Sequence, residues 1–375
     1  MFWRWVAASP GIATRSFARS LAVGYRGQDD KGVLQGGPMY VIREALPKRW
    51  HFLATIFAVV GLIGCLPALQ SNQLIQIFRD LVMIDQGLLS ADEDPFVFNL
   101  LSGTVLAAIT GAVIFGGLHR IAGTARVLVP VMTAVYLVAV LVALTLNAGA
   151  IPSAFSMILT DAFTGEAAAG GSLLAVVLYG VQRGAYSNEA GMGTESLVHG
   201  AAKTNEPIRE GLVAMIGPIL DTLIVCTATA LMILIAGTWQ SDASQGVTLT
   251  ANAFSTLLGP AGTVVVFICV LCFATTTIFT YSFYGSQCAS YVFGTKYINA
   301  YRMVFVLSIV LIAVVSIESA VSLIDGSFAL MAIPTMVSAI LLAPRVLQAA
   351  KIYFAKLDAD DDTPKSDGTL DQQPV

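Results

Sequence analysis

The sequence predicts an all-α protein that crosses a membrane many times. Of its 375 residues, 56% are hydrophobic and only 12% are charged, and the mean hydropathy is +0.76. Ordinary soluble domains carry about 25% charged residues. Several apolar runs also reach the roughly 20 residues that a helix needs to span the hydrocarbon core. An ordinary soluble domain is therefore excluded, and the net charge of -4 says little about partners.

We predict nine hydrophobic segments. The first is the weakest, because three arginines and Pro10 intrude on it, and it lacks the clean apolar core of a signal peptide. The segments lie at residues 2–21, 52–78, 96–118, 127–146, 172–198 (interrupted), 212–235, 257–288, 304–317 and 323–342.

The charges of the connecting loops predict an orientation. Loops after the first, third, fifth, seventh and ninth segments are basic, whereas the loops between them are acidic or neutral. Because basic loops stay in the cytoplasm, we expect these loops and the C-terminus to be cytoplasmic. We expect a transmembrane domain at residues 1–344 and a largely disordered, acidic cytoplasmic tail at residues 345–375.

The same orientation places Met1 outside, at the very edge of a span. Nothing precedes it that would direct such an insertion. The sequence therefore predicts that an N-terminal region is missing.

Residues 179–200, YGVQRGAYSNEAGMGTESLVHG, interrupt the fifth segment. Each glycine in a helix interior costs about 1 kcal/mol relative to alanine, and serine and asparagine compete for backbone hydrogen bonds. Unpaired backbone at membrane depth is tolerated only where protein buries it or it lines a cavity. We therefore predict a helix that breaks around residues 185–193.

Two interpretations of this stretch stay open. Glycines in membrane helices often only permit close packing. Glu189 favours a functional break, because an ionisable residue inside the bilayer is a functional candidate by default. The alternatives for Glu189 are an ion pair with Arg183 or a position near the interface.

Residues 183–212 and 221–239 resemble the signature of the sodium:alanine (alanine/glycine:cation) symporter family. GGPMYVI at 36–42, QSN at 70–72, GGLHRI at 116–121 and MAIP at 331–334 resemble family segments in the expected order. The resemblance covers almost the whole chain except the tail. It implies a leucine-transporter-like inverted-repeat bundle in which helices one and six are broken. Residues 1–5 resemble the interior of the second core helix, so the first core helix is expected to be absent.

The resemblance also implies an activity. It is sodium-coupled symport of a small neutral amino acid, alanine or glycine first, by alternating access across the cell (plasma or inner) membrane. The expected partners are the amino acid, the sodium ion and the lipid bilayer. No cofactor, enzymatic activity or nucleic-acid partner is expected. The sequence contains no GxxxxGK[ST] loop, so ATP is not implied.

A zwitterionic substrate needs dipoles for its carboxylate and acceptors for its ammonium, and the ends of two half-helices supply both. In the family that this chain resembles, the residues at Gln70 and Asn72 face the substrate; the alternative is a bond to another helix. Tyr186 stands where the family usually has Phe, and Tyr281 where it usually has Trp, so the substrate need not be alanine. The expected substrate-binding residues are Gln70, Asn72, Tyr186, Ser187, Asn188, Gly191 and Tyr281.

Thr276 and Thr277 match the Ser-Thr pair that resembles the sodium ligands of related transporters. The alternative is that these hydroxyls bond their own backbone. Glu189 and Asp221 are the candidates for coupling the ion to the substrate. For Asp221, and for Asp325 at the start of the last span, interfacial capping is the alternative.

Three other functions are weighed against symport. A family member without its first core helix would be incompetent for transport, and coupling through Glu189 would use protons instead of sodium. An intramembrane enzyme is disfavoured because no HExxH motif occurs. Cys269 and Cys272 have CxxC spacing, but no second pair completes a zinc site, so packing is favoured.

Overall fold

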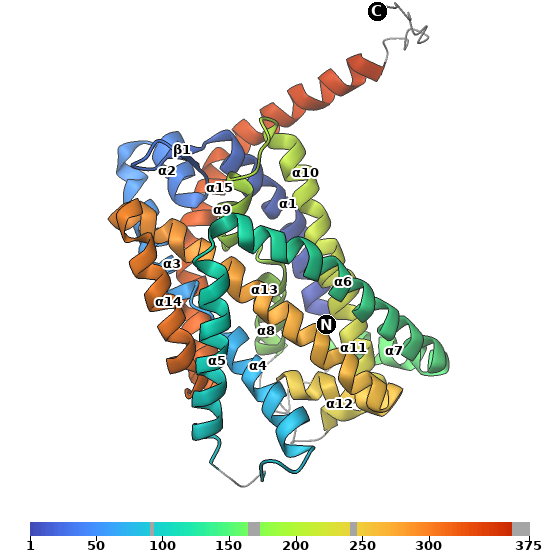
Figure 1. Ribbon diagram of the computed structural model, residues 1–375. Helices are drawn as coiled ribbons and strands as arrows, with labels where there is room; N and C mark the ends of the chain where they lie inside the picture. The colour runs from blue at the N-terminus through green and yellow to red at the C-terminus, as the bar shows by residue number, and fades with distance from the viewer. Residues whose placement is uncertain (91–93, 164–172, 241–245, 362–375) are drawn as a thin grey trace, which may run out of the picture.

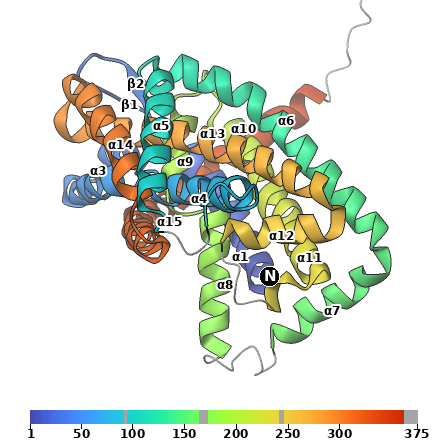
Figure 2. The same cartoon turned by 60° about the horizontal axis from the view of Figure 1, so that its bottom comes forward.

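The computed structural model describes residues 1–90, 94–163, 173–240 and 246–361, and almost all of them are helical (Figures 1 and 2). The all-α polytopic membrane fold is confirmed. The helices are α1 Phe2–Gly24, α2 Pro38–Ala45, α3 His51–Gly64, α4 Ala68–Phe78, α5 Phe96–Ile114, α6 Gly117–Leu146, α7 Ile151–Asp161, α8 Leu173–Asn188, α9 Thr194–Gly200, α10 Pro207–Pro218, α11 Cys226–Ala236, α12 Val247–Leu258, α13 Pro260–Phe293, α14 Ile298–Ala313 and α15 Ile317–Asp361. Strands β1 (Gly27–Gln28) and β2 (Leu34–Gln35) pair antiparallel, with Gly27 opposite Gln35.

Seven helical stretches in the described residues are long and apolar enough to cross a membrane, where the sequence predicts nine segments. The difference comes from α1, which three arginines make too polar, and from the interrupted segment, which is split into α8 and α9. The seven stretches are Lys48–Ile84, Phe96–Ile114, Arg120–Leu146, Pro207–Ala236, Pro260–Phe293, Thr295–Ala313 and Ile317–Asp358.

Three further boundaries differ from the prediction. The segment at 52–78 is two helices, α3 and α4, because Pro67 has no N–H to continue the helix. The short helices α7 and α12 were not predicted at all. The division at residue 344 falls inside α15, which continues to Asp361, and residues 362–375 lie outside the described part.

α13 and α1 both pack against the interrupted helix. α13 contacts α3, α4, α6 and α12, and Ile278 on it is fully buried in the main core with Phe57 and Phe254. α1 packs against α8, α9 and α10. α6 lies along the outside in both views, and its exposed apolar side chains, such as Val138 and Leu141, suit contact with lipid (Figures 1 and 2).

Candidate functional site

The interrupted helix breaks where the sequence predicts. α8 ends at Asn188 and α9 begins at Thr194, and residues 189–193 connect them without helical structure. Gly191 and Gly193 both have φ of +83°, and Glu189 has φ of +49°. Among the described residues, Glu189 is the one non-glycine with positive φ. Such a backbone costs of order 1–3 kcal/mol and persists only where the surroundings impose it.

Asn188 is fully buried at the end of α8. Its Oδ1 accepts the backbone N–H of Ala190 at 2.9 Å and so shapes the turn out of the helix. Its Nδ2 has no hydrogen-bond partner. Leaving a buried donor unpaired costs about 1–3 kcal/mol, so this amide is poised for an acceptor that the chain does not supply.

α1 packs against the amide end of the Asn188 side chain. A Cβ built on Gly11 would lie 3.1 Å from Asn188 Nδ2. The missing side chain therefore lets α1 approach the break closely. The last four carbonyls of any helix also lack a partner within that helix, so the end of α8 adds free acceptors beside the Asn188 donor.

Glu189 ties the two half-helices together. Its Oε2 accepts the Thr194 hydroxyl at 2.6 Å, and its Oε1 accepts the Tyr281 hydroxyl of α13 at 3.2 Å. The expected alternative of an ion pair with Arg183 is wrong, because Arg183 Nη2 lies 3.5 Å from Asp325 instead.

Asp221 lies beside the break. It belongs to a π-helical turn, Ile219–Val225, and its Oδ2 accepts the hydroxyl of Ser187, the residue before Asn188. Cys226 Sγ lies 3.2 Å from the same hydroxyl. Two carboxylates, Glu189 and Asp221, therefore flank the end of α8.

Asp325 gathers polar groups from one face of α8. Its carboxylate accepts Gln182 Nε2 at 3.1 Å as well as Arg183, and its backbone carbonyl accepts the Tyr186 hydroxyl at 3.3 Å. The Tyr186 ring meets Phe328 edge-on at 5.6 Å. Tyr186 therefore faces α15 next to the break.

Two of the predicted substrate residues lie on α4. Gln70 Oε1 is buried without a partner, which leaves it available to a ligand. Asn72 Nδ2 donates to the Val315 carbonyl at 2.9 Å, as in the alternative interpretation. No hydrogen bond in the described part of the chain joins either residue to the break.

The predicted sodium ligands also engage their own helix. The Thr276 hydroxyl donates to the carbonyls of Cys272 and Phe273 at 2.8 and 3.0 Å, and Thr277 donates to Phe273 at 2.8 Å. All three bonds are those of the structural alternative. They leave the hydroxyl lone pairs free, so the sodium role stays a prediction.

A buried ionic cluster between α1 and α9 was not predicted from the sequence. Glu195, in the first turn of α9, pairs with both Arg15 and Arg19 of α1. The side chains of Arg15, Arg19 and Glu195 are only 12%, 4% and 18% exposed. Two arginines four positions apart lie on one helix face, and that spacing was the available signal. The cluster anchors α9 to α1.

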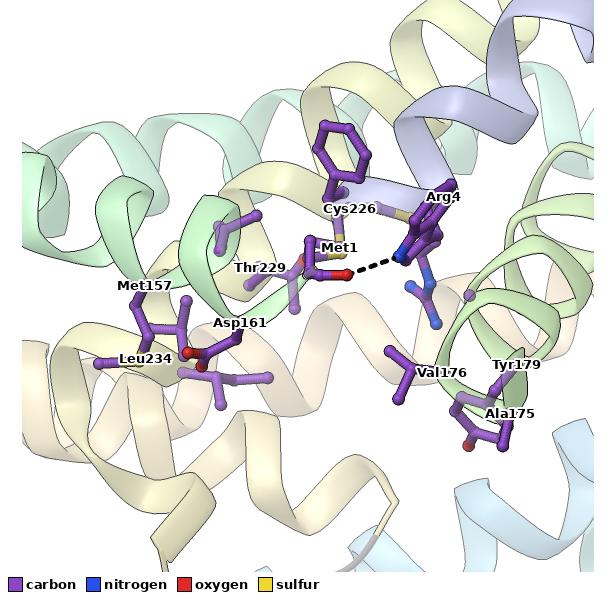
Figure 3. Close-up of a pocket in the computed structure, with 17 residues that line it drawn as sticks. Met1, Arg4, Met157, Asp161, Ala175, Val176, Tyr179, Cys226, Thr229 and Leu234 are labelled. Atoms are coloured by element: carbon purple, nitrogen blue, oxygen red, sulfur yellow. Dashed lines mark hydrogen bonds between the residues drawn. The ribbon is translucent and has the colours of Figure 1, made fainter. Parts of the chain in front are cut away.

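A cavity of about 790 Å³ lies between α1, α7, α8 and α11 (Figure 3). Arg4, Asp161, Tyr179 and Thr229 are among its lining residues, and most of the others are apolar. Cys226 also lines it and contacts Ser187. None of residues 187–193 lines the cavity, so Cys226 connects the cavity wall to the end of α8 without opening the cavity to the break.

Replacing Gly193 by alanine should destabilise the break. The residue has φ of +83°, and a Cβ would lie 2.5 Å from Thr335 Oγ1 and 2.6 Å from Pro38 Cγ. Backbone strain and overpacking together should cost about 2–4 kcal/mol, measured as a lower thermal unfolding temperature in detergent. Gly149→Ala is the control, because a Cβ there meets nothing within 4 Å; equal stability of the two variants would contradict this geometry.

Comparison with known proteins adds independent information. Residues 1–367 match the model of the sodium:alanine symporter family. The chain is 37% identical over 359 residues to the sodium/alanine symporter AgcS of Methanococcus maripaludis, covering 94% of this chain and 77% of that protein. It is 34% identical to an uncharacterized transporter of Haemophilus influenzae, covering 95% of this chain and 77% of that protein. It is also 31% identical to the probable sodium/glutamine symporter GlnT of Bacillus subtilis, covering 96% of this chain and 73% of that protein.

Proposed function

Because this chain belongs to the sodium:alanine symporter family, we propose that it carries a small neutral amino acid across the cell membrane by alternating access, with sodium as the co-transported ion and the C-terminus in the cytoplasm. The observation that carries this proposal is the break at residues 189–193, next to a buried, unpaired donor at Asn188 and two carboxylates, Glu189 and Asp221, at the end of α8.

The proposed substrate site uses the two ends of the break. The substrate carboxylate accepts from Asn188 Nδ2, the donor without a partner. The substrate ammonium donates to the freed carbonyls at the end of α8. Gly191 lets Met336 of α15 pack directly against the break, since a Cβ there would lie 2.8 Å from Met336 Sδ. Ser187, Tyr186 and Tyr281 wall the site, and the free Oε1 of Gln70 adds an acceptor from α4.

The proposed coupling uses the carboxylates at the break. Hydroxyls of Thr194 and Tyr281 hold Glu189, and the hydroxyl of Ser187 holds Asp221. The oxygens of these hydroxyls can turn toward a cation. Sodium is a hard cation that takes oxygen ligands, and half-helix carbonyls are a known source of them. A potential of 100 mV contributes about 2.3 kcal/mol per charge moved, so one sodium ion drives substantial accumulation.

Valine at Thr276 and at Thr277 tests the proposed sodium ligands. Each change removes a hydroxyl oxygen while keeping the shape of the side chain, so the sodium concentration for half-maximal uptake should rise about tenfold. Thr275→Val is the matched control, because Thr275 likewise bonds its own helix at Leu271. An unchanged sodium dependence in both variants would remove Thr276 and Thr277 as ligands.

The substrate is tested with a panel, because one relative is named for alanine and another for glutamine. Purified protein in liposomes should accumulate labelled alanine, glycine or glutamine when sodium is outside. Replacing sodium by choline should stop the uptake. Uptake that persists in choline would refute sodium coupling and favour protons, and no uptake of any amino acid would refute the proposed function.

A further inference from the structure

A second cavity, of about 350 Å³, lies where α4 continues into the π-helical turn Arg79–Ile84. The start of α5 and the link between α14 and α15 complete its wall. In Figure 1 this end of α4 lies at the opposite end of the molecule from the C-terminus. The orientation expected from the loop charges makes this the outer side. The volume is at the lower end of the range for ligand pockets, about 300–1,000 Å³, and so suits a small solute.

Two groups in this cavity lack part of their hydrogen bonding. Asn99 Oδ1 is buried and has no partner. Arg79 Nε donates a hydrogen bond to Asp80 Oδ1 at 3.0 Å, whereas the terminal nitrogens of Arg79 bond no residue that the structure describes. The cavity therefore holds a lone acceptor and a guanidinium edge with free donors.

The neighbouring polar groups are already engaged. Asp80 also accepts the Thr248 hydroxyl at 2.9 Å, and Asn72 Nδ2 is held by the Val315 carbonyl at 2.9 Å. These bonds fix the wall of the cavity around the two incomplete groups. Because a buried polar group is normally paired, the Asn99 oxygen points to a ligand that supplies a donor. The Arg79 guanidinium, 25% exposed and lining the same cavity, suits the anionic end of such a ligand.

We propose that this cavity is a second amino-acid site, in which Arg79 binds the substrate carboxylate and Asn99 Oδ1 accepts a hydrogen bond from the ammonium. Planar guanidinium groups pair well with carboxylates. The inference rests on the proposed function, since the ligand is the transported amino acid.

Its place in the fold suggests how the second site serves transport. Ile317, the first residue of α15, lines the cavity, and Asp325 lies eight positions further along the same helix. At 1.5 Å per residue that is about 12 Å. The cavity therefore lies about two turns of α15 from Asp325, whose polar contacts border α8 and the break.

Binding stoichiometry tests the inference. We would measure equilibrium binding of labelled alanine, glycine and glutamine to the purified full chain in sodium, and expect two molecules per chain. Arg79→Gln should leave one, with second-site affinity at least tenfold weaker. Asn99→Leu should do the same, and it removes an unpaired buried acceptor, so it is not expected to impair folding. Arg126→Gln, at an exposed position, is the matched control and should keep two.

The outcomes separate the two proposals. Asn188→Ala should retain the molecule bound at Arg79 and lose the other. One bound molecule in the wild type, unchanged in Arg79→Gln and Asn99→Leu, would overturn the second site and leave the proposed function standing. Two bound molecules in all of these proteins would also overturn it, whereas no binding to the wild type would overturn both.

Discussion

Replacing Asn188 by alanine should lower amino-acid uptake about 100-fold while the protein still reaches the membrane. The change removes the donor without a partner and also the acceptor that holds the Ala190 amide at 2.9 Å. A hydrogen bond to a charged group contributes about 1.5–3 kcal/mol, so losing it accounts for most of this factor. The turn out of α8 then loses its own support. Sodium-driven uptake into liposomes measures the effect.

The matched control for this variant is Asn147→Ala. Like Asn188, Asn147 stands at the end of a helix, in this case α6. Its side chain also bonds the backbone, because Asn147 Nδ2 donates to the Ala143 carbonyl at 2.9 Å. Its loss should leave uptake near the wild-type value. Equal uptake by the two variants would remove Asn188 from the site.

Replacing Glu195 by glutamine should produce the largest loss of stability. Glu195 pairs with Arg15 and Arg19, whose side chains are 12% and 4% exposed. Removing one partner of a buried ionic group leaves uncompensated charge and costs about 3–5 kcal/mol. Thermal unfolding in detergent, followed by loss of the monodisperse peak in size-exclusion chromatography, measures the change.

Glu206→Gln is the control for Glu195. Glu206 pairs with Arg209 at 3.5 Å, but these side chains are 54% and 70% exposed. Exposed pairs contribute roughly 0–1 kcal/mol, so the unfolding temperature should hardly move. If the two glutamine variants unfold at the same temperature, the cluster on α1 does not anchor α9.

The break in the fifth hydrophobic segment could be predicted because its signal is local. Gly191, Gly193 and the residues before them conflict with a continuous helix in one short stretch. The division of α3 from α4 was missed although Pro67 marks it, because the apolar run on both sides reads as a single span. The short helices α7 and α12 are too brief to satisfy the length of a span.

Partners distant in sequence could not be assigned from the sequence. Glu195 lies 180 positions from Arg15, so the arginines of α1 read only as interruptions of an apolar segment. The sequence did not decide between a coupling role and a capping role for Asp221. Its hydrogen bond from Ser187 depends on the packing of the π-helical turn against the end of α8, which the sequence does not show. The free oxygen of Gln70 and the engaged amide of Asn72 are likewise decided by packing.

The position of a bound amino acid tests the central claim most directly. In a structure determined with sodium and a transported amino acid, we expect the ligand between Asn188 and Gly193, with its carboxylate within hydrogen-bonding distance of Asn188 Nδ2 and its ammonium at the α8 carbonyls. A ligand bound away from residues 188–193, with the break closed by the chain's own side chains, would contradict the account.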